Sequence, residues 1–229
     1  MVKNIDKGMI YINKTIVSAS LLACDFASLA HESERCAKAG VDWIHFDVMD
    51  GHFVEQITYG SAVLKAIDKV TDKFMDVHLM VDNPERQIPL FARAGADLIN
   101  VHIESTKDVF GCLEEIRAFG LKSAVAVKPN TPVEEAYKYL SLCDMVLVMT
   151  VEPGYGGQSF MTDMLAKVTK LREYADKNGF SELDIQVDGG VNVRTARLAR
   201  NAGANVLVAG TGLFGAADMN AVCAALKGI

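Results

Sequence analysis

The chain has no long apolar run and no cluster of basic residues. It has 229 residues, half of them hydrophobic, and a formal net charge of -6. No stretch approaches the length that a bilayer span requires, so we expect a soluble protein with no membrane partner. The acidic balance argues against nucleic acid as a partner. The expected partner is therefore a small molecule.

Cysteines are few and show no pairing pattern. The chain has five, an odd number, and none of them form a CxxC pair. This spacing does not suit a disulfide framework and is typical of reduced thiols in the cytoplasm. We therefore expect a cytoplasmic protein.

The chain also has no linker rich in proline and serine. A chain of this length can bury one sizeable core. We therefore expect one domain at residues 16–229, preceded by an N-terminal extension at residues 1–15 that need not be ordered.

Short apolar runs rich in β-branched residues alternate with segments of helical period. We expect strands at Ile16–Ser20, Trp43–Val48, Phe74–Met80, Leu98–Ile103, Ser123–Val127, Met145–Thr150, Asp184–Val187 and Val206–Ala209. We expect helices at Phe26–Ala39, Pro84–Ala94, Val109–Phe119, Met164–Lys177 and Thr195–Ala202. Eight such units predict an α/β fold, a single parallel (β/α)₈ TIM barrel. An open doubly wound sheet is less favoured, because no GxGxxG follows the first strand.

Metal-capable residues stand at the ends of three expected strands. His45 and Asp47 share one face of the second strand, since alternate side chains point the same way. His78 lies near the end of the third strand and Asp188 ends the seventh. Barrels of this class place their active sites at that end. Two imidazoles and two carboxylates suit Zn²⁺, Fe²⁺, Mn²⁺ or Co²⁺.

Other residues of the same types have simpler interpretations. We interpret His31, His52 and His102 as hydrogen-bonded core or surface residues. Taken singly, an aspartate after a strand, such as Asp50 or Asp144, is interpreted as a cap of the following turn.

Glycines follow the last two expected strands. Gly189 and Gly190 come after the seventh, and Gly210 and Thr211 after the eighth. Their backbone N–H groups and the Thr211 hydroxyl lie where such barrels bind phosphate. A phosphorylated ligand is therefore expected.

Five separate motifs resemble the ribulose-phosphate 3-epimerase family, in the family's order. They are HFDVMDGHF, DVHLMV, MTVEPGYGGQSF, VDGGV and VAGTGLF, within a match from about Ile16 to about Phe214. The resemblance implies one catalytic divalent ion, zinc or else iron, manganese or cobalt. It assigns the metal to His45, Asp47, His78 and Asp188, and acid/base roles to Asp47 and Asp188. It also implies a homo-oligomer.

The resemblance assigns further roles around the substrate. Met49, Met80 and Met149 would line the reacting carbons, although their ordinary role is core packing. The loop after the sixth strand would close over the substrate. The implied substrate-binding residues are Ser20, His78, Gly154, Tyr155, Gly156, Gly157, Asp188, Gly189, Gly190, Gly210 and Thr211.

The implied reaction is that of an isomerase, which converts D-ribulose 5-phosphate to D-xylulose 5-phosphate through an enediolate. D-allulose 6-phosphate is the alternative substrate, because Val54-Glu55-Gln56 departs from the family's usual VPN. Decarboxylase or aldolase chemistry would require a catalytic lysine, and no DxKxxD cluster is present. A non-catalytic sugar-phosphate binder would not need two carboxylates around a metal. Lys128 and Glu152 are interpreted either as an ion pair at the mouth or as solvated loop charges.

Overall fold

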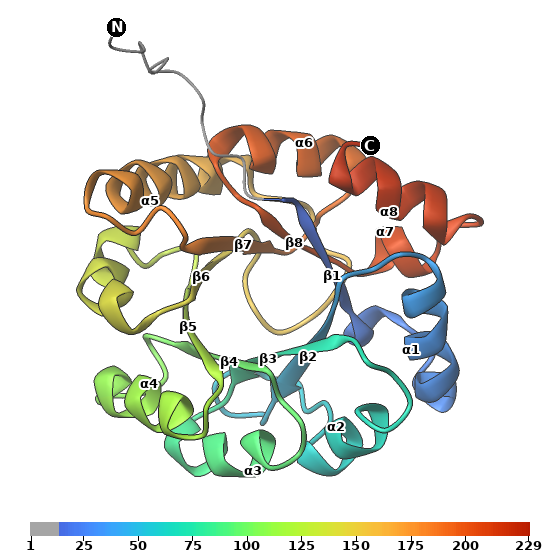
Figure 1. The fold of residues 1–229 in the computed structure, drawn as a ribbon, viewed down its shortest axis with the longest axis horizontal. Coiled ribbons are helices and arrows are strands. Elements are labelled where there is room, and N and C mark those ends of the chain that lie inside the picture. The colour runs from blue at the N-terminus through green and yellow to red at the C-terminus, as the bar shows by residue number, and fades with distance from the viewer. Residues whose placement is uncertain (1–13) are drawn as a thin grey trace, which may run out of the picture.

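Eight parallel strands close into a barrel in the computed structural model, which describes residues 14–229 (Figure 1). The order of residues 1–13 lies outside the described part of the chain. The strands are β1 (Ile16–Ser20), β2 (Trp43–Met49), β3 (Phe74–Met80), β4 (Leu98–His102), β5 (Lys122–Val127), β6 (Met145–Met149), β7 (Asp184–Asp188) and β8 (Val206–Ala209). The predicted (β/α)₈ barrel is confirmed, and all eight strands begin and end within one residue of the predicted positions.

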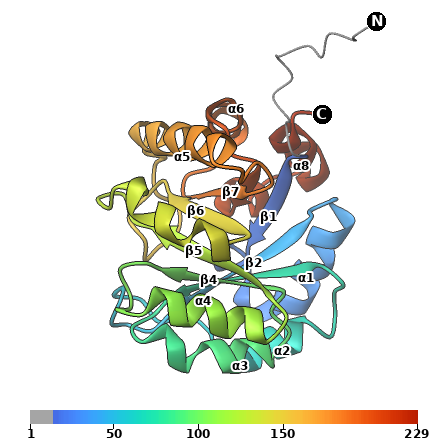
Figure 2. The ribbon, with the colours of Figure 1, turned by 60° about the vertical axis from the view of Figure 1, so that its left-hand side comes forward.

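Helices surround the barrel on its outside (Figure 2). They are α1 (Leu29–Lys38), α2 (Ser61–Ile67), α3 (Ile88–Ala92), α4 (Val109–Ala118), α5 (Leu165–Lys177), α6 (Val193–Ala202), α7 (Thr211–Phe214) and α8 (Met219–Lys227). The five predicted helical segments are confirmed, two of them beginning with a 3₁₀ turn. The connection between β5 and β6 is a 3₁₀ helix, η4 (Val133–Leu142). No helix of residues 14–229 is long and apolar enough to cross a membrane.

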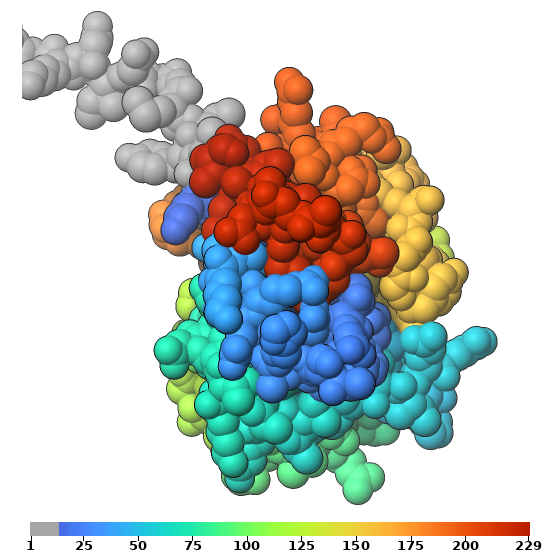
Figure 3. Space-filling model, turned by 90° about the vertical axis from the view of Figure 1, so that its right-hand side faces the viewer, coloured from blue at the N-terminus to red at the C-terminus, as the bar shows by residue number. Residues whose placement is uncertain are grey.

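The two ends of the described chain meet at the closure of the barrel. β1 pairs with β2 on one side and with β8 on the other. Figure 3 shows the consequence, since the early and late segments, blue and red, lie side by side on one face. Closure leaves no free sheet edge, so every strand has two hydrogen-bonded neighbours.

The barrel interior changes from apolar to polar along its axis. Its floor is an apolar cluster that consists of Trp43, Leu98, Ala124, Met145 and Val206, with Ile16 and Phe74 packed against it. The rings of Trp43 and Phe74 stack at 4.5 Å. Two residues further along β2 and β3, His45 and Asp76 take the same inward direction and are fully buried. The packed floor closes one end, so that a ligand can enter only from the C-terminal ends of the strands.

Four polar residues join alternate pairs of strands at the floor. The carboxylates of Asp42, Asp97 and Asp144 accept the backbone N–H groups of Val17, Met75 and Ser123, and the amide oxygen of Asn205 accepts that of Ile185, at 2.7–2.9 Å. Each of the four residues also donates its own N–H to the carbonyl of the same partner, at 2.8–3.0 Å. These paired bonds satisfy strand ends that parallel pairing leaves open.

Removal of the hydrogen bond from the N–H of Met75 to Asp97 tests the contribution of these paired bonds to stability. Asp97→Ala leaves the N–H of Met75 without its acceptor, and we expect the free energy of unfolding to fall by about 1–3 kcal/mol. Asp97→Asn keeps an acceptor oxygen and should lose less. Urea denaturation of both variants measures the difference, and equal stability of Asp97→Ala and the parent protein would contradict it.

Candidate active site

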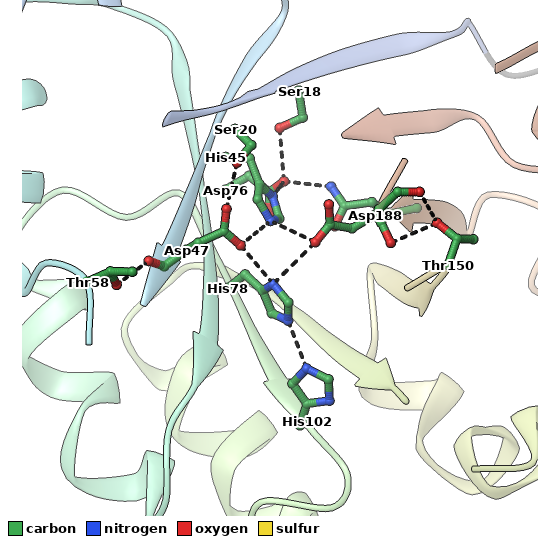
Figure 4. Close-up of polar contacts among 12 residues, drawn as sticks. Ser18, Ser20, His45, Asp47, Thr58, Asp76, His78, His102, Thr150 and Asp188 are labelled. Atoms are coloured by element: carbon green, nitrogen blue, oxygen red, sulfur yellow. Dashed lines mark hydrogen bonds and ion pairs between the residues drawn. The ribbon is translucent and has the colours of Figure 1, made fainter. Parts of the chain in front are cut away.

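His45, Asp47, His78 and Asp188 converge at the C-terminal ends of β2, β3 and β7 (Figure 4). One ligand atom from each lies within 4.8 Å of all the others. The Oδ1 atom of Asp47 is 3.2 Å from Nε2 of His45 and 3.3 Å from Nδ1 of His78. The Oδ2 atom of Asp188 is 3.9 Å from both nitrogens. The four predicted residues therefore face one common point.

His45 is oriented from below by Asp76. The Nδ1 atom of His45 donates to Oδ2 of Asp76 at 2.7 Å, and the same oxygen accepts bonds from Ser18 at 3.0 Å and Gln186 at 2.6 Å. This fixes the proton of His45 on Nδ1. The buried Nε2 atom has no hydrogen-bond partner in the described chain, and it faces the carboxylates of Asp47 and Asp188. A lone pair and two carboxylate oxygens around one point suit a divalent cation.

A second histidine contacts the other ring nitrogen of His78. Its Nε2 atom lies 2.9 Å from Nε2 of His102, whose Nδ1 lies 3.0 Å from a carboxylate oxygen of Glu104. His78 and His102 are fully buried. Burial lowers the pKa of His102 to about 4, which keeps this imidazole neutral.

Threonine hydroxyls hold the backbone of both candidate acid/base residues. Thr58 donates to the carbonyl of Asp47 at 2.7 Å, and Thr150 donates to the carbonyl of Asp188 at 2.8 Å. The hydroxyl of Ser20 donates to Oδ2 of Asp47 at 2.7 Å. Both carboxylates are therefore held at their backbone, and one also at its side chain.

The two carboxylates have different proton affinities. Burial alone would raise the pKa of Asp47, but His45 and His78 outweigh burial and lower it. Burial and the charge of Asp47 together raise the pKa of Asp188 to about 6. Burial alone would lower the pKa of His45, but Asp47 and Asp76 hold it well above the ordinary value. One ionised carboxylate therefore faces one that protonates readily.

A cavity of about 260 Å³ lies directly over this cluster. Its lining includes Asp47 and Asp188 and nearly all the other predicted site residues: Ser20, Met49, Met80, Met149, Gly154, Tyr155, Gly156, Gly157, Gly189, Gly190, Gly210 and Thr211. His45 and His78 lie beneath the cavity and are fully buried. The lining includes no lysine from the described residues.

Glycines bring two active-site loops into direct contact. Gly190 has φ +67°, and a Cβ atom there would lie 2.4 Å from the backbone nitrogen of Phe160. A Cβ on Gly189, at φ +116°, would lie 2.4 Å from the side chain of Val151. Only glycine permits this packing between the β6–α5 loop and the turn after β7. One wall of the cavity therefore depends on both loops.

The interpretations of the remaining histidines and of Asp50 are confirmed, whereas that of Asp144 as a turn cap is wrong. His31 and His52 are exposed, and His102 is buried and hydrogen-bonded. Asp50 accepts the N–H groups of His52 and Phe53, as a turn cap does. Asp144 accepts from a neighbouring strand instead, at the opposite end of the barrel.

Of the two interpretations of Lys128 and Glu152, the ion pair at the mouth is wrong. The ammonium group of Lys128 lies 3.7 Å from the ring centroid of Phe53. The carboxylate of Glu152 accepts from the side chain of Asn130 at 3.4 Å. These loops direct the two charges to different partners.

Sequence reasoning did not identify Asp76, His102 and Glu104 as parts of the site. A signal was present, because Asp76 and His78 are separated by two positions, as are His102 and Glu104. His45 and Asp47 have the same spacing, which places both members of a pair on one face of a strand. The two-residue spacing that identified His45 and Asp47 in β2 would also have identified Asp76, His102 and Glu104.

Proteins named ribulose-phosphate 3-epimerase match almost the whole chain. One from Bacillus subtilis (strain 168) is 44% identical over 212 residues, which cover 93% of this chain and 98% of that protein. One from Eremothecium gossypii is 45% identical over 225 residues, with 93% and 92% covered. A protein from Oryza sativa subsp. japonica, named as the cytoplasmic isoform, is 43% identical over 215 residues and covers 92% of each chain.

Solved structures of lower identity share the fold. A 3-hexulose-6-phosphate synthase has a TM-score of 0.69 at 21% identity, covering 93% of this chain and 98% of that one. A 3-keto-L-gulonate-6-phosphate decarboxylase from Vibrio cholerae has a TM-score of 0.70 at 14% identity, covering 94% and 97%. At these identities the likeness shows the barrel alone. The model of the ribulose-phosphate 3 epimerase family, in contrast, matches residues 16–214. Together with the close relatives, this match shows that the chain belongs to the ribulose-phosphate 3-epimerase family of isomerases.

Proposed function

We propose that the protein is a metal-dependent 3-epimerase that interconverts D-ribulose 5-phosphate and D-xylulose 5-phosphate. The observation that carries the proposal is the pair Asp47 and Asp188, which line one cavity and face one cation-sized point. The names of the relatives support the choice of a pentulose phosphate. The absence of lysine from the described cavity lining gives no support to Schiff-base chemistry.

Epimerisation beside a ketone needs a proton to leave one face of the carbon and another to arrive at the opposite face. Asp47 on β2 and Asp188 on β7 reach the cavity from different sides of the barrel (Figure 4). Asp47 is suited to take the proton because its lowered pKa keeps it ionised, while Asp188 is suited to supply one. The roles reverse in the opposite direction. The planar species between the two transfers is an enediolate.

A divalent ion held by His45, Asp47, His78 and Asp188 would supply Lewis-acid stabilisation of the negative charge on the substrate oxygens. Ser20 keeps the carboxylate of Asp47 in place through its 2.7 Å bond. Met49, Met80 and Met149 are almost fully buried and line the same cavity. Their thioethers exclude water from the reacting carbons without adding a competing base.

The phosphate would bind at the glycine-rich side of the cavity. Gly189, Gly190, Gly210 and Thr211 line it after β7 and β8, where backbone N–H groups can face an anion. The loop residues Gly154, Tyr155, Gly156 and Gly157 line the same cavity and would close over the sugar. Gln158 holds this loop in shape, because its amide donates to the carbonyls of Glu152 and Tyr155.

A homo-oligomer and a cytoplasmic location are also proposed. The family resemblance supports the first. The name of the rice relative supports the second.

The choice of sugar is tested by kcat/KM on D-ribulose 5-phosphate and D-allulose 6-phosphate, measured side by side with metal-loaded protein. We expect a strong preference for the pentulose phosphate. A preference for the hexulose phosphate would replace the substrate but keep the chemistry. Inactivity on both would contradict the proposed function.

The two-base assignment predicts that Asp47→Asn and Asp188→Asn each lose turnover by at least about 100-fold, because each removes a proton carrier. Metal content of each variant is measured alongside kcat. Asp50→Asn, at a nearby turn cap, is the control and should keep its activity. Near-normal turnover of Asp47→Asn or Asp188→Asn at full metal occupancy would rule out two-base transfer.

Metal binding should release protons in a pH-dependent way. In the metal-free protein, the raised pKa of His45 leaves its imidazole protonated, and Asp188 protonates below a pKa of about 6. We expect more protons to be released at about pH 5 than at about pH 7.5, with affinity falling as pH falls. Calorimetry in buffers of different ionisation enthalpy counts these protons. Asp50→Asn should not change the count, and a count independent of pH would contradict the assignment.

A further inference from the structure

His102 and Glu104 stand outside the roles assigned so far. His102 is the last residue of β4 and Glu104 lies in the turn that follows, and neither is among the four residues that face the cation point. His102 has no exposed surface, whereas the side chain of Glu104 is 21% exposed at the mouth. A buried imidazole needs hydrogen-bond partners, because burial of an unpaired polar group costs free energy.

The partner of this pair is His78. The Nε2 atoms of His78 and His102 are 2.9 Å apart, so one proton lies between them. His78 directs Nδ1 to the cation point, which requires a lone pair there and places its proton on Nε2. His78 therefore donates, and His102 accepts.

The proton of His102 is fixed by the same logic. Since its Nε2 accepts, its own proton is on Nδ1, 3.0 Å from Oε2 of Glu104. The other carboxylate oxygen of Glu104 accepts the backbone N–H of Lys128 at 2.8 Å, which anchors Glu104 to the start of the β5–η4 loop. Each donor in this chain has one acceptor.

The chain is also protected from water. The ring of Phe53 lies against His102, with centroids 4.9 Å apart, and the ammonium of Lys128 lies 3.7 Å from the centroid of Phe53. Lys128 therefore packs over Phe53, which in turn covers His102. The hydrogen bonds below it lie in a less polar environment and are correspondingly stronger.

We propose that His102 and Glu104 are positioning residues that fix the tautomer and ring orientation of His78 for the metal. Each metal-facing imidazole is then connected by hydrogen bonds to a carboxylate. His45 bonds directly to Asp76, and His78 is connected through His102 to Glu104. Such partners orient a ligand and raise its basicity. The inference rests on the proposed metal site.

Glu104→Gln is the primary variant, because it keeps the volume and can keep the bond from the Lys128 N–H while it removes the charge. His102→Phe keeps a ring beneath Phe53 but removes the acceptor for His78. Asp97→Asn is the matched control, since Asp97 also accepts a backbone N–H from a neighbouring strand, at the far end of the barrel.

The dissociation constant for Co²⁺ alone is measured by chelator competition, together with the visible spectrum of the bound ion and the melting temperature of the metal-free protein. Glu104→Gln should weaken Co²⁺ binding by about 10- to 100-fold and change the spectrum, with the metal-free melting temperature nearly unchanged. His102→Phe should weaken binding at least as much. Asp97→Asn should leave both metal readouts unchanged.

Two outcomes would overturn the inference. If the parent protein binds Co²⁺ and Glu104→Gln binds it equally well with the same spectrum, the positioning role is wrong and the proposed metal site stands. If the parent protein does not bind Co²⁺, both the inference and the proposed metal dependence are wrong.

Discussion

The structure depends on one electrostatic constraint, the meeting of two carboxylates and two imidazoles in a buried interior. Asp47 and Asp188 cannot both be ionised there unless a positive charge lies between them. In the metal-free protein, the raised pKa values of His45 and Asp188 show where protons supply that charge. A divalent cation satisfies the same requirement with both carboxylates ionised. In the proposed mechanism, metal binding and proton transfer therefore use the same atoms.

The barrel holds this charged centre from below and from the side. Its apolar floor closes the lower end, so the polar residues above it are reached only from the mouth. Asp76 orients His45, while His102 orients His78 from the direction of the rim. These contacts come from β3, which pairs with the strand that carries His45 and Asp47, and from β4, the next strand around the barrel. The ligand residues are thus held by strands, whereas Gly189 and Gly190, both with positive φ, lie in the turn after β7.

The sequence predicted the barrel well because alternation in strands and periodicity in helices are local properties. The same alternation brought His45 and Asp47 to one face, and strand order brought His78 and Asp188 beside them. Short elements were missed, since the seven residues of α2 span only about two helical turns and carry a weak periodic signal. The ion pair, one of two interpretations of Lys128, does not form because loop geometry, which periodicity does not encode, places its ammonium over Phe53. His102 was interpreted in isolation, so its contact with His78 on the neighbouring strand was not predicted.

A crystal structure of the protein grown with Mn²⁺, with anomalous scattering recorded for the metal, tests the central claim most directly. We expect one strong anomalous peak within bonding distance of Nε2 of His45, Nδ1 of His78, Oδ1 of Asp47 and Oδ2 of Asp188. We also expect that His45 keeps its Nδ1 bond to Asp76. A peak elsewhere in the cavity, or ligation through Nδ1 of His45 or Nε2 of His78, would contradict the account.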